Sequence, residues 1–238
     1  MTTARRTERV AAPTGDSFDA HAFTPGGGGP GVLLLQEIFG FEEFLESKAQ
    51  LLAGVGCSVL VPDVFWRVER NVSLAHDEAA LQTGFGYMGR FSEIPREVTT
   101  GDLVAALAHL RSLPEVTGKA GVIGYCLGGR LAFEVAAASE LDACVSYYGS
   151  GIAAELDLAE RITCPVLFHF GGSDPYIQRE AIDAIAAVFM GRAGTELVVQ
   201  EEAGHAFENS FAPMFFEPQA AAASWPVTLA FLDRTLRS

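Results

Sequence analysis

The sequence predicts an α/β fold in which a mostly parallel sheet carries helices on both faces. Short apolar runs, such as residues 31–35 and 166–170, alternate along the chain with longer amphipathic segments. An unbroken apolar run is typical of a buried parallel strand, and alternation with helices is typical of β-α-β units. With 238 residues, 49% of them apolar, the chain can form a single domain over 1–238 with a large core.

The expected elements follow in order along the chain. Strands are predicted at 9–12, 17–23, 31–35, 58–61, 122–124, 143–148, 165–170 and 196–200. Helices are predicted at 42–53, 94–113, 129–136, 179–191 and 224–236, with short helices in 63–91 that glycines interrupt. Residues 26–29, four glycines between two prolines, predict a loop. This loop lacks the Lys-Ser/Thr ending of a phosphate-binding loop.

Composition excludes several classes of protein. The net charge of −14 argues against nucleic-acid binding, which needs clustered Lys and Arg. No run is long and apolar enough to span a membrane, and the first nine residues do not resemble a signal peptide. The four cysteines form no Cys-x-x-Cys pair and no metal-ligand spacing, so a cytoplasmic protein without metal or cofactor is expected. Cys57, Cys144 and Cys164 lie at the edges of apolar runs and are expected in the core.

The segment Gly124-Tyr125-Cys126-Leu127-Gly128 lies between an apolar run and a helical pattern. A strand, a Gly-x-nucleophile-x-Gly turn and a helix form the nucleophile elbow of an α/β-hydrolase, with a thiol here in place of the usual hydroxyl. Glycine is needed there because strand and helix approach each other closely. The alternative is a buried structural cysteine, but the strand–turn–helix setting favours Cys126 as a nucleophile.

A thiol nucleophile needs a base that deprotonates it and an acid residue that orients the base. In this fold the nucleophile comes first along the chain, then Asp or Glu, then His. Asp174 follows the apolar run 166–170 and the glycine turn after that run. His205 follows a glycine after the last expected strand. The alternatives are a turn aspartate and an exposed loop histidine. The other histidines are expected to be structural: His21 in a strand, His76 and His109 on helix faces, and His169 in a core strand.

An oxyanion hole needs two backbone N–H groups. Leu127, just after the nucleophile, should supply one, and Ile38, in the loop after an early strand, should supply the other. Glu37 would then lie near the thiol, although it could equally be a surface glutamate. Candidate pocket walls, each of which could equally be ordinary core, are Phe39, Trp66, Tyr87, Phe91 and Phe207.

The sequence resembles the dienelactone hydrolase family along nearly its whole length. The matching motifs are Gln36-Glu37-Ile38-Phe39-Gly40, Val61-Pro62-Asp63, Gly101-Asp102-Leu103, Gly124-Tyr125-Cys126-Leu127-Gly128-Gly129, Tyr147-Tyr148-Gly149, Gly172-x-Asp174 and Gly204-His205-x-Phe207. The resemblance implies a Cys126–His205–Asp174 triad that hydrolyses an enol-lactone through a thioester. It also implies that Glu37 keeps the resting thiol protonated and takes its proton once substrate arrives.

Two departures from the family pattern concern the substrate. Family members hold the substrate carboxylate with two arginines, and the matching positions here are Asn209 and Gly84, with Arg90 close by. A bidentate carboxylate clamp is therefore not assured. The sequence predicts a hydrolase of small lactones or activated esters, as a monomer or small homo-oligomer. The alternatives are a broad carboxylesterase and a non-hydrolytic thiol sensor or binding protein.

Overall fold

A computed structural model describes residues 4–237 of the chain. Its backbone packing divides the chain into two compact units, Met1–Gly121 and Val122–Ser238. The strand β5 (Val116–Tyr125) runs from the first unit into the second. The prediction that 1–238 forms a single domain stays a prediction.

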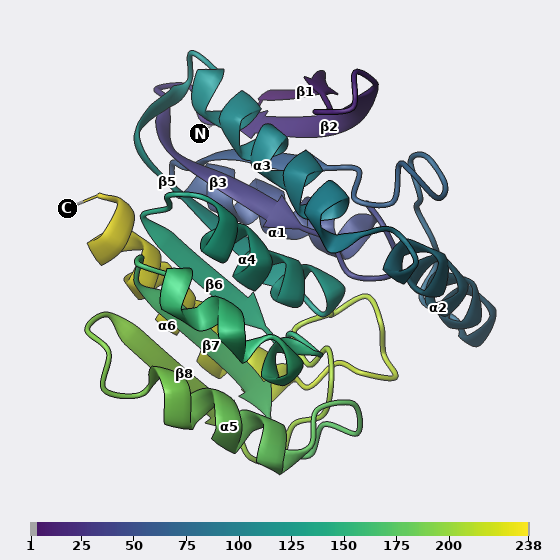
Figure 1. Cartoon of the computed structure of the whole chain (residues 1–238), viewed down its shortest axis with the longest axis vertical. Coiled ribbons are helices and arrows are strands. Elements are labelled where there is room, and N and C mark those ends of the chain that lie inside the picture. The colour runs from purple at the N-terminus through teal and green to yellow at the C-terminus, as the bar shows by residue number, and fades with distance from the viewer. Residues whose placement is uncertain (1–3, 238) are drawn as a thin grey trace. The chain divides into compact units, whose positions relative to one another are not determined.

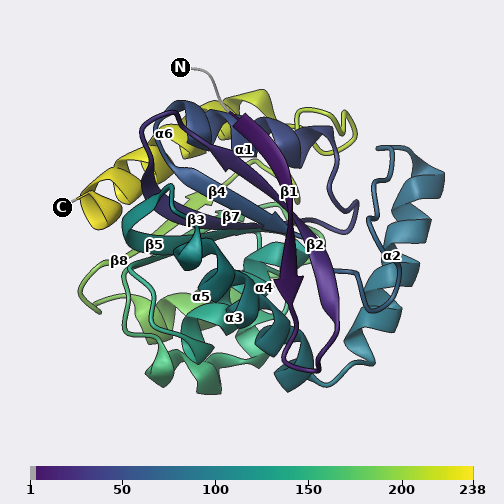
Figure 2. The ribbon, with the colours of Figure 1, turned by 90° about the horizontal axis from the view of Figure 1, so that it is seen from above.

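The first unit is built on four strands before β5. These are β1 (Ala4–Ala11), β2 (Ser17–Thr24), β3 (Gly29–Leu35) and β4 (Ser58–Pro62), in the order β1-β2-β4-β3. β1 and β4 are antiparallel to β2, and β3 is parallel to β4. Its helices are α1 (Glu43–Gly54), α2 (Glu78–Ser92) and α3 (Arg96–Ser112). Figures 1 and 2 show α1 and α3 on opposite faces of these strands.

The second unit repeats this layering around three parallel strands. These are β6 (Ala143–Tyr147), β7 (Val166–Gly171) and β8 (Thr195–Gln200), with β7 in the middle. Helices α4 (Leu127–Ala138) and α5 (Arg179–Phe189) cover one face, and α6 (Pro218–Leu236) covers the other (Figures 1 and 2). Short 3-10 turns at Ile152–Ala154 and Leu156–Arg161 connect β6 to β7. Helices therefore cover both faces of the strands in each unit, as predicted.

Burial explains why these strands could be predicted from the sequence. Every residue of β3, β4, β6 and β7 is buried, and these strands are the mostly apolar runs of the sequence. Strands covered on both faces need apolar residues at every position, whereas a half-exposed strand would alternate. β8 is only half-buried along its length, because within its unit it pairs with β7 alone.

Two predicted boundaries near the N-terminus are wrong. β1 covers Ala4–Ala11 rather than 9–12, because it pairs with β2 along its whole length. Charged residues are not typical of a strand, but Arg6 of β1 forms an ion pair with Glu115 at 2.6 Å. Gly29 belongs to β3 rather than to a loop, since its N–H donates to the carbonyl of Glu115 at 2.9 Å. These partners lie far away in the sequence, so local patterns did not reveal them.

Three helical predictions also need correction. α2 is one helix of 15 residues rather than several short ones, because interior glycines weaken a helix by only about 1 kcal/mol each. α6 begins at Pro218 rather than at Ser224, since proline is well accommodated in a first turn. His76 precedes α2 rather than lying on a helix face, and its Nε2 is 3.1 Å from the Glu42 carboxylate.

Candidate active site

Cys126 occupies a strained turn between β5 and α4. Its φ is 55°, in the left-handed region that side chains rarely adopt. A Cβ atom added at Gly124 would overlap the carbonyl oxygen of Gly128, and one at Gly129 would lie 2.6 Å from the carbonyl oxygen of Tyr147. The predicted requirement for glycine is confirmed at Gly124, and that at Gly128 stays a prediction.

His205 connects Cys126 to Asp174. Its Nε2 lies 3.1 Å from the sulfur of Cys126, and its Nδ1 lies 2.7 Å from Oδ2 of Asp174. These are hydrogen-bond distances at both ring nitrogens. The three residues are 48 and 31 positions apart along the chain, counted from 126 to 174 to 205. They converge because each follows a strand of the parallel set: β5, β7 and β8.

The carboxylate of Asp174 is held in place by the turn that follows it. Its Oδ1 accepts hydrogen bonds from the N–H groups of Tyr176 at 2.8 Å and Ile177 at 3.2 Å. The same aspartate therefore stabilises a turn and orients His205, so the two alternatives weighed for Asp174 are compatible. With one oxygen fixed by backbone, the other is available to fix the tautomer and orientation of the imidazole.

The imidazole of His205 is buried between two tyrosines. Its ring centre lies 5.1 Å from that of Tyr148 and 5.1 Å from that of Tyr176, and the histidine is only 7% exposed. Burial by itself lowers the pKa of His205. The charge at Cys126 and the hydrogen bond that His205 donates to Asp174 outweigh burial and raise this pKa.

Titration of His205 tests which interactions raise its pKa and which lower it. In Cys126→Ala we expect the pKa of His205 to fall, because the largest of the effects that raise it is removed and burial remains. Asp174→Asn should also lower it. The measurement is an NMR titration of the histidine ring protons. Burial lowers the pKa of His169 to about 3, so its signals are an internal control that stays unchanged between variants. An unchanged pKa of His205 in Cys126→Ala would contradict this account.

Backbone strain is concentrated around these side chains. Besides Cys126, Tyr148 has φ 38° and Ala206 has φ 55°. Tyr148 lies against His205, and Ala206 directly follows it. Left-handed residues other than glycine cost of order 1 kcal/mol or more and persist where the surroundings enforce them. Such strain is common at functional sites and supports the location of the site in this part of the second unit.

Leu127, a predicted oxyanion donor, is the first residue of α4. Backbone N–H groups in the first turn of a helix have no acceptor within that helix and lie at its positive end. The N–H of Cys126 itself is already used, because it donates to the carbonyl of Tyr147 at 3.0 Å. The position of Leu127 therefore suits the predicted role, which stays a prediction.

Two other predicted residues lie in the loop after His205. Phe207 is fully buried, with its ring centre 5.2 Å from that of Tyr148. Asn209 is also fully buried, and its side-chain oxygen accepts the N–H of Phe211 at 3.1 Å. Both therefore support the loop that carries His205. Their predicted substrate contacts stay predictions.

The remaining predicted site residues belong to the first unit. Glu37, Ile38 and Phe39 follow β3 and are buried, and their predicted roles toward Cys126 stay predictions. Tyr87 and Arg90 lie on α2. The guanidinium of Arg90 lies 6.0 Å from the Tyr87 ring centre and donates to the carbonyl of Val68 at 2.7 Å.

Gly84 packs directly against the loop that carries Ile38. A Cβ atom added at Gly84 would lie 2.9 Å from the carbonyl oxygen of Ile38 and 3.2 Å from its side chain. This backbone therefore has no room for any side chain at position 84, and the absence of arginine there is built into the packing of α2.

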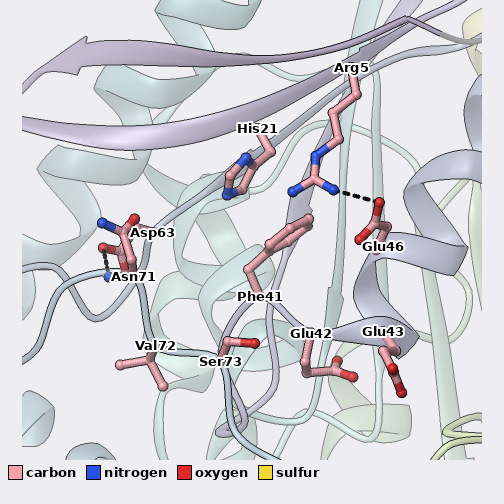
Figure 3. A pocket seen from close by; sticks show the side chains of 10 residues that line it. All are labelled: Arg5, His21, Phe41, Glu42, Glu43, Glu46, Asp63, Asn71, Val72 and Ser73. Carbon is pink, nitrogen blue, oxygen red and sulfur yellow. Dashed lines mark hydrogen bonds and ion pairs between the residues drawn. The ribbon is translucent and has the colours of Figure 1, made fainter.

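Pocket residues that the sequence analysis missed lie elsewhere in the first unit (Figure 3). The pocket has a volume of about 270 Å³. His21 stacks on Phe41 with ring centres 4.1 Å apart, and Arg5 pairs with Glu46 at 2.7 Å. Burial raises the pKa of Asp63 to about 6. The signal that could have pointed here is Asp63, which directly follows the buried strand β4.

The other cysteines differ from Cys126 in their surroundings. Cys57 and Cys144 are buried, as predicted, whereas Cys164 is half-buried. Burial raises the pKa of Cys144 well above its usual value and that of Cys164 to about 11. Such thiols stay protonated and unreactive at neutral pH.

Within residues 4–237, no group of three or more His, Cys, Asp or Glu residues is placed to hold a metal ion. In the same part of the chain, no helix has the length and apolar character that a membrane crossing requires.

Strands alternating with helices, a strained elbow and an acid–histidine pair at strand ends define an α/β-hydrolase. The family model for the "Dienelactone hydrolase family" matches residues 18–236, and the chain belongs to this family. It is a hydrolase of the carboxymethylenebutenolidase type, acting on ester or lactone bonds.

Similar proteins cover nearly the full length of the chain. Carboxymethylenebutenolidase 1 of Cupriavidus pinatubonensis is 33% identical over 90% of this chain and 91% of its own length. A carboxymethylenebutenolidase of a Pseudomonas species is 34% identical over 94% of this chain and 93% of its own. The solved structure named m3DLH is 27% identical, with a TM-score of 0.80 over 99% of this chain and all of that one. A dienelactone hydrolase structure from Anabaena variabilis, 18% identical with a TM-score of 0.73, shows the same fold over 99% of this chain and 100% of its own.

Proposed function

We propose that Cys126, His205 and Asp174 act together to hydrolyse small lactones or activated esters through a thioester acyl-enzyme. The observation that supports this most directly is the pair of contacts at His205, 3.1 Å to the thiol and 2.7 Å to the carboxylate. A base within hydrogen-bond distance of the nucleophile, itself oriented by a third group, is the arrangement that nucleophilic catalysis requires.

In the first half of the reaction, His205 takes the thiol proton of Cys126 as the sulfur attacks the substrate carbonyl carbon and forms a C–S bond. The carbonyl electron pair moves onto oxygen, where the N–H of Leu127 stabilises the charge. The tetrahedral intermediate collapses by breaking the bond to the leaving oxygen, and His205 donates its proton to that oxygen. In a lactone the leaving oxygen stays attached to the acyl group, so ring opening gives a thioester with a free hydroxyl or enol.

In the second half, His205 removes a proton from water as the water attacks the thioester carbonyl. The C–S bond breaks, the sulfur leaves and the carboxylic acid product forms. Asp174 keeps its negative charge throughout and stabilises the imidazolium that forms twice in each cycle.

The packing at Gly84 favours substrates without a carboxylate. Position 84 cannot carry an arginine without displacing the Ile38 carbonyl, and position 209 is a buried asparagine. Two arginines would recognise a carboxylate with paired hydrogen bonds, and neither position supplies an arginine. A broad carboxylesterase is therefore the second candidate function.

A substrate panel tests the proposal and separates the candidates. Wild type and Cys126→Ala are assayed with an enol-lactone carboxylate, the methyl ester of that carboxylate and open-chain p-nitrophenyl esters. We expect the wild type to hydrolyse the neutral lactone at least as well as the charged one. Faster hydrolysis of the open-chain esters than of both lactones would favour the carboxylesterase. Failure to hydrolyse any of them, with reversible oxidation of Cys126 instead, would overturn the proposal in favour of a thiol sensor.

A further inference from the structure

A buried network of polar side chains lies in the second unit, on the α6 side of β6 and β7. The members of this α6 network are Glu208, Ser224, Tyr147, Thr228 and His169, all between 0% and 2% exposed. The hydroxyl of Thr228 lies 2.6 Å from that of Tyr147 and 3.0 Å from Nε2 of His169. The hydroxyl of Ser224 donates to the Glu208 carboxylate.

The donor and the acceptor of each hydrogen bond in the α6 network can be assigned. Glu208 accepts the hydroxyl of Ser224, because a carboxylate only accepts hydrogen bonds. Burial lowers the pKa of His169 to about 3, so its ring is neutral, and its Nδ1 has no hydrogen-bond partner among residues 4–237. A buried N–H without an acceptor is rarer than an acceptor without a donor, which places the proton on Nε2. His169 then donates to Thr228 and Thr228 to Tyr147, while Ser224 donates to Glu208.

The α6 network reaches both halves of the proposed site. The backbone carbonyl of Tyr147 accepts the N–H of Cys126 at 3.0 Å. The next residue, Tyr148, places its ring 5.1 Å from His205, and its N–H donates to the carbonyl of His169 at 2.7 Å. Glu208 lies three residues after His205 in the same loop. The nucleophile is thus held through one end of the network and the base through the other.

Helix α6 supplies the link between the two ends. Ser224 and Thr228 are four residues apart, so their side chains lie on the same face of the helix. One binds the loop that carries His205, and the other binds the strand that precedes Tyr148. Apolar side chains would fill this core without the cost of burying polar groups. Hydrogen-bonded polar side chains, in contrast, hold one another in one arrangement.

We propose that Ser224 and Thr228 are positioning residues that hold the sulfur of Cys126 in line with Nε2 of His205. This inference rests on the proposed function, because it assigns the α6 network a role in that reaction. The hydroxyl groups of the network do not contact the reacting atoms. They act through the Tyr147–Tyr148 backbone and through Glu208.

The test removes single hydroxyl groups from the centre of the network. Tyr147→Phe keeps the ring that stacks on His169 at 4.3 Å, and Thr228→Val keeps the shape of the side chain. We expect each variant to lower kcat by about tenfold or more while KM changes by less than about twofold, since small misalignments of reacting groups are costly. Thr228→Ser restores the hydroxyl and should restore kcat. The double variant should lose less than the two single variants combined, because both single variants remove the Tyr147–Thr228 bond.

Thr235→Val is the matched control. It is the same substitution on the same helix, at a half-buried threonine whose hydroxyl donates to the carbonyl of Phe231 at 2.7 Å. We expect it to leave kcat unchanged. The second readout is the pH dependence of Cys126 alkylation by iodoacetamide, which reports the coupling of the thiol to His205. Its midpoint should shift in Tyr147→Phe and Thr228→Val, and not in Thr235→Val.

Several outcomes would overturn the inference. These are an unchanged kcat per folded molecule in Tyr147→Phe, a loss that Thr228→Ser does not restore, or an equal loss in Thr235→Val. If Thr228→Val does not fold, Tyr147→Phe decides by the same criteria. Full activity in Cys126→Ala would overturn the proposed function instead. In that case the alkylation midpoints still decide whether the α6 network aligns Cys126 with His205.

Discussion

Cys126→Ala is expected to abolish hydrolysis of every substrate in the panel, with a loss in kcat of at least about a thousandfold. The substitution removes the sulfur that lies 3.1 Å from His205 and leaves no nucleophile at the elbow. The rest of the fold should be unaffected, because Cys126 is only partly buried and alanine is smaller. The measurement is steady-state turnover of enol-lactones and p-nitrophenyl esters, with circular dichroism to confirm folding.

Two further cysteine variants sharpen this result. Cys164→Ala removes a half-buried thiol of raised pKa, and we expect full activity. Cys126→Ser should also be poor, since a hydroxyl is far less acidic than a thiol. Activity in Cys126→Ala near that of the wild type would show that hydrolysis proceeds without a covalent thioester, and the assignment of Cys126 would be wrong.

His205→Ala is expected to lower kcat by at least about a hundredfold, the usual scale of general acid–base catalysis. The imidazole lies within hydrogen-bond distance of the Cys126 sulfur, at 3.1 Å. Asp174→Asn should lower kcat less, because the imidazole remains but loses its charged partner at 2.7 Å. Comparing the two variants at several pH values separates the loss of the base from the loss of its orientation.

His109→Ala is the control for this comparison. His109 lies on α3 and pairs with Glu8 at 3.0 Å, so its removal changes the histidine content without touching Cys126, Asp174 or His205. We expect unchanged kcat. If Asp174→Asn were silent while His205→Ala was inactive, another carboxylate would have to orient the base.

The elbow could be predicted because its requirements are local. Two glycines around Cys126 allow a turn that places the cysteine at a φ of 55°, and the apolar run before it continues as a buried strand. Asp174 and His205 could be predicted because strand ends in such folds meet at one edge of the sheet. The sequence did not reveal that Asp174 also accepts two N–H groups from its own turn, because that depends on backbone geometry.

The errors arose where partners are distant in the sequence. The charged strand β1 is long because it pairs with β2 along its whole length. Its Arg6 forms an ion pair with Glu115. The early start of α6 was missed, and Ser224, the predicted first residue, lies inside the helix and binds Glu208. The sequence also marked Tyr147 and Tyr148 only as part of a motif and did not indicate that one supports Cys126 and the other His205.

The sequence by itself determined the α/β class, and it predicted the elbow at Cys126 and the chain order Cys126, Asp174 and His205. These follow from apolar periodicity and glycine placement, which act over a few residues. The tertiary structure alone decided that the imidazole of His205 reaches Cys126 and Asp174 together and that Gly84 has no room for a side chain. It alone also decided that Ser224 and Thr228 bind residues of other elements. Such contacts depend on the angles and distances between packed elements, and those are set by the whole core rather than by any local pattern.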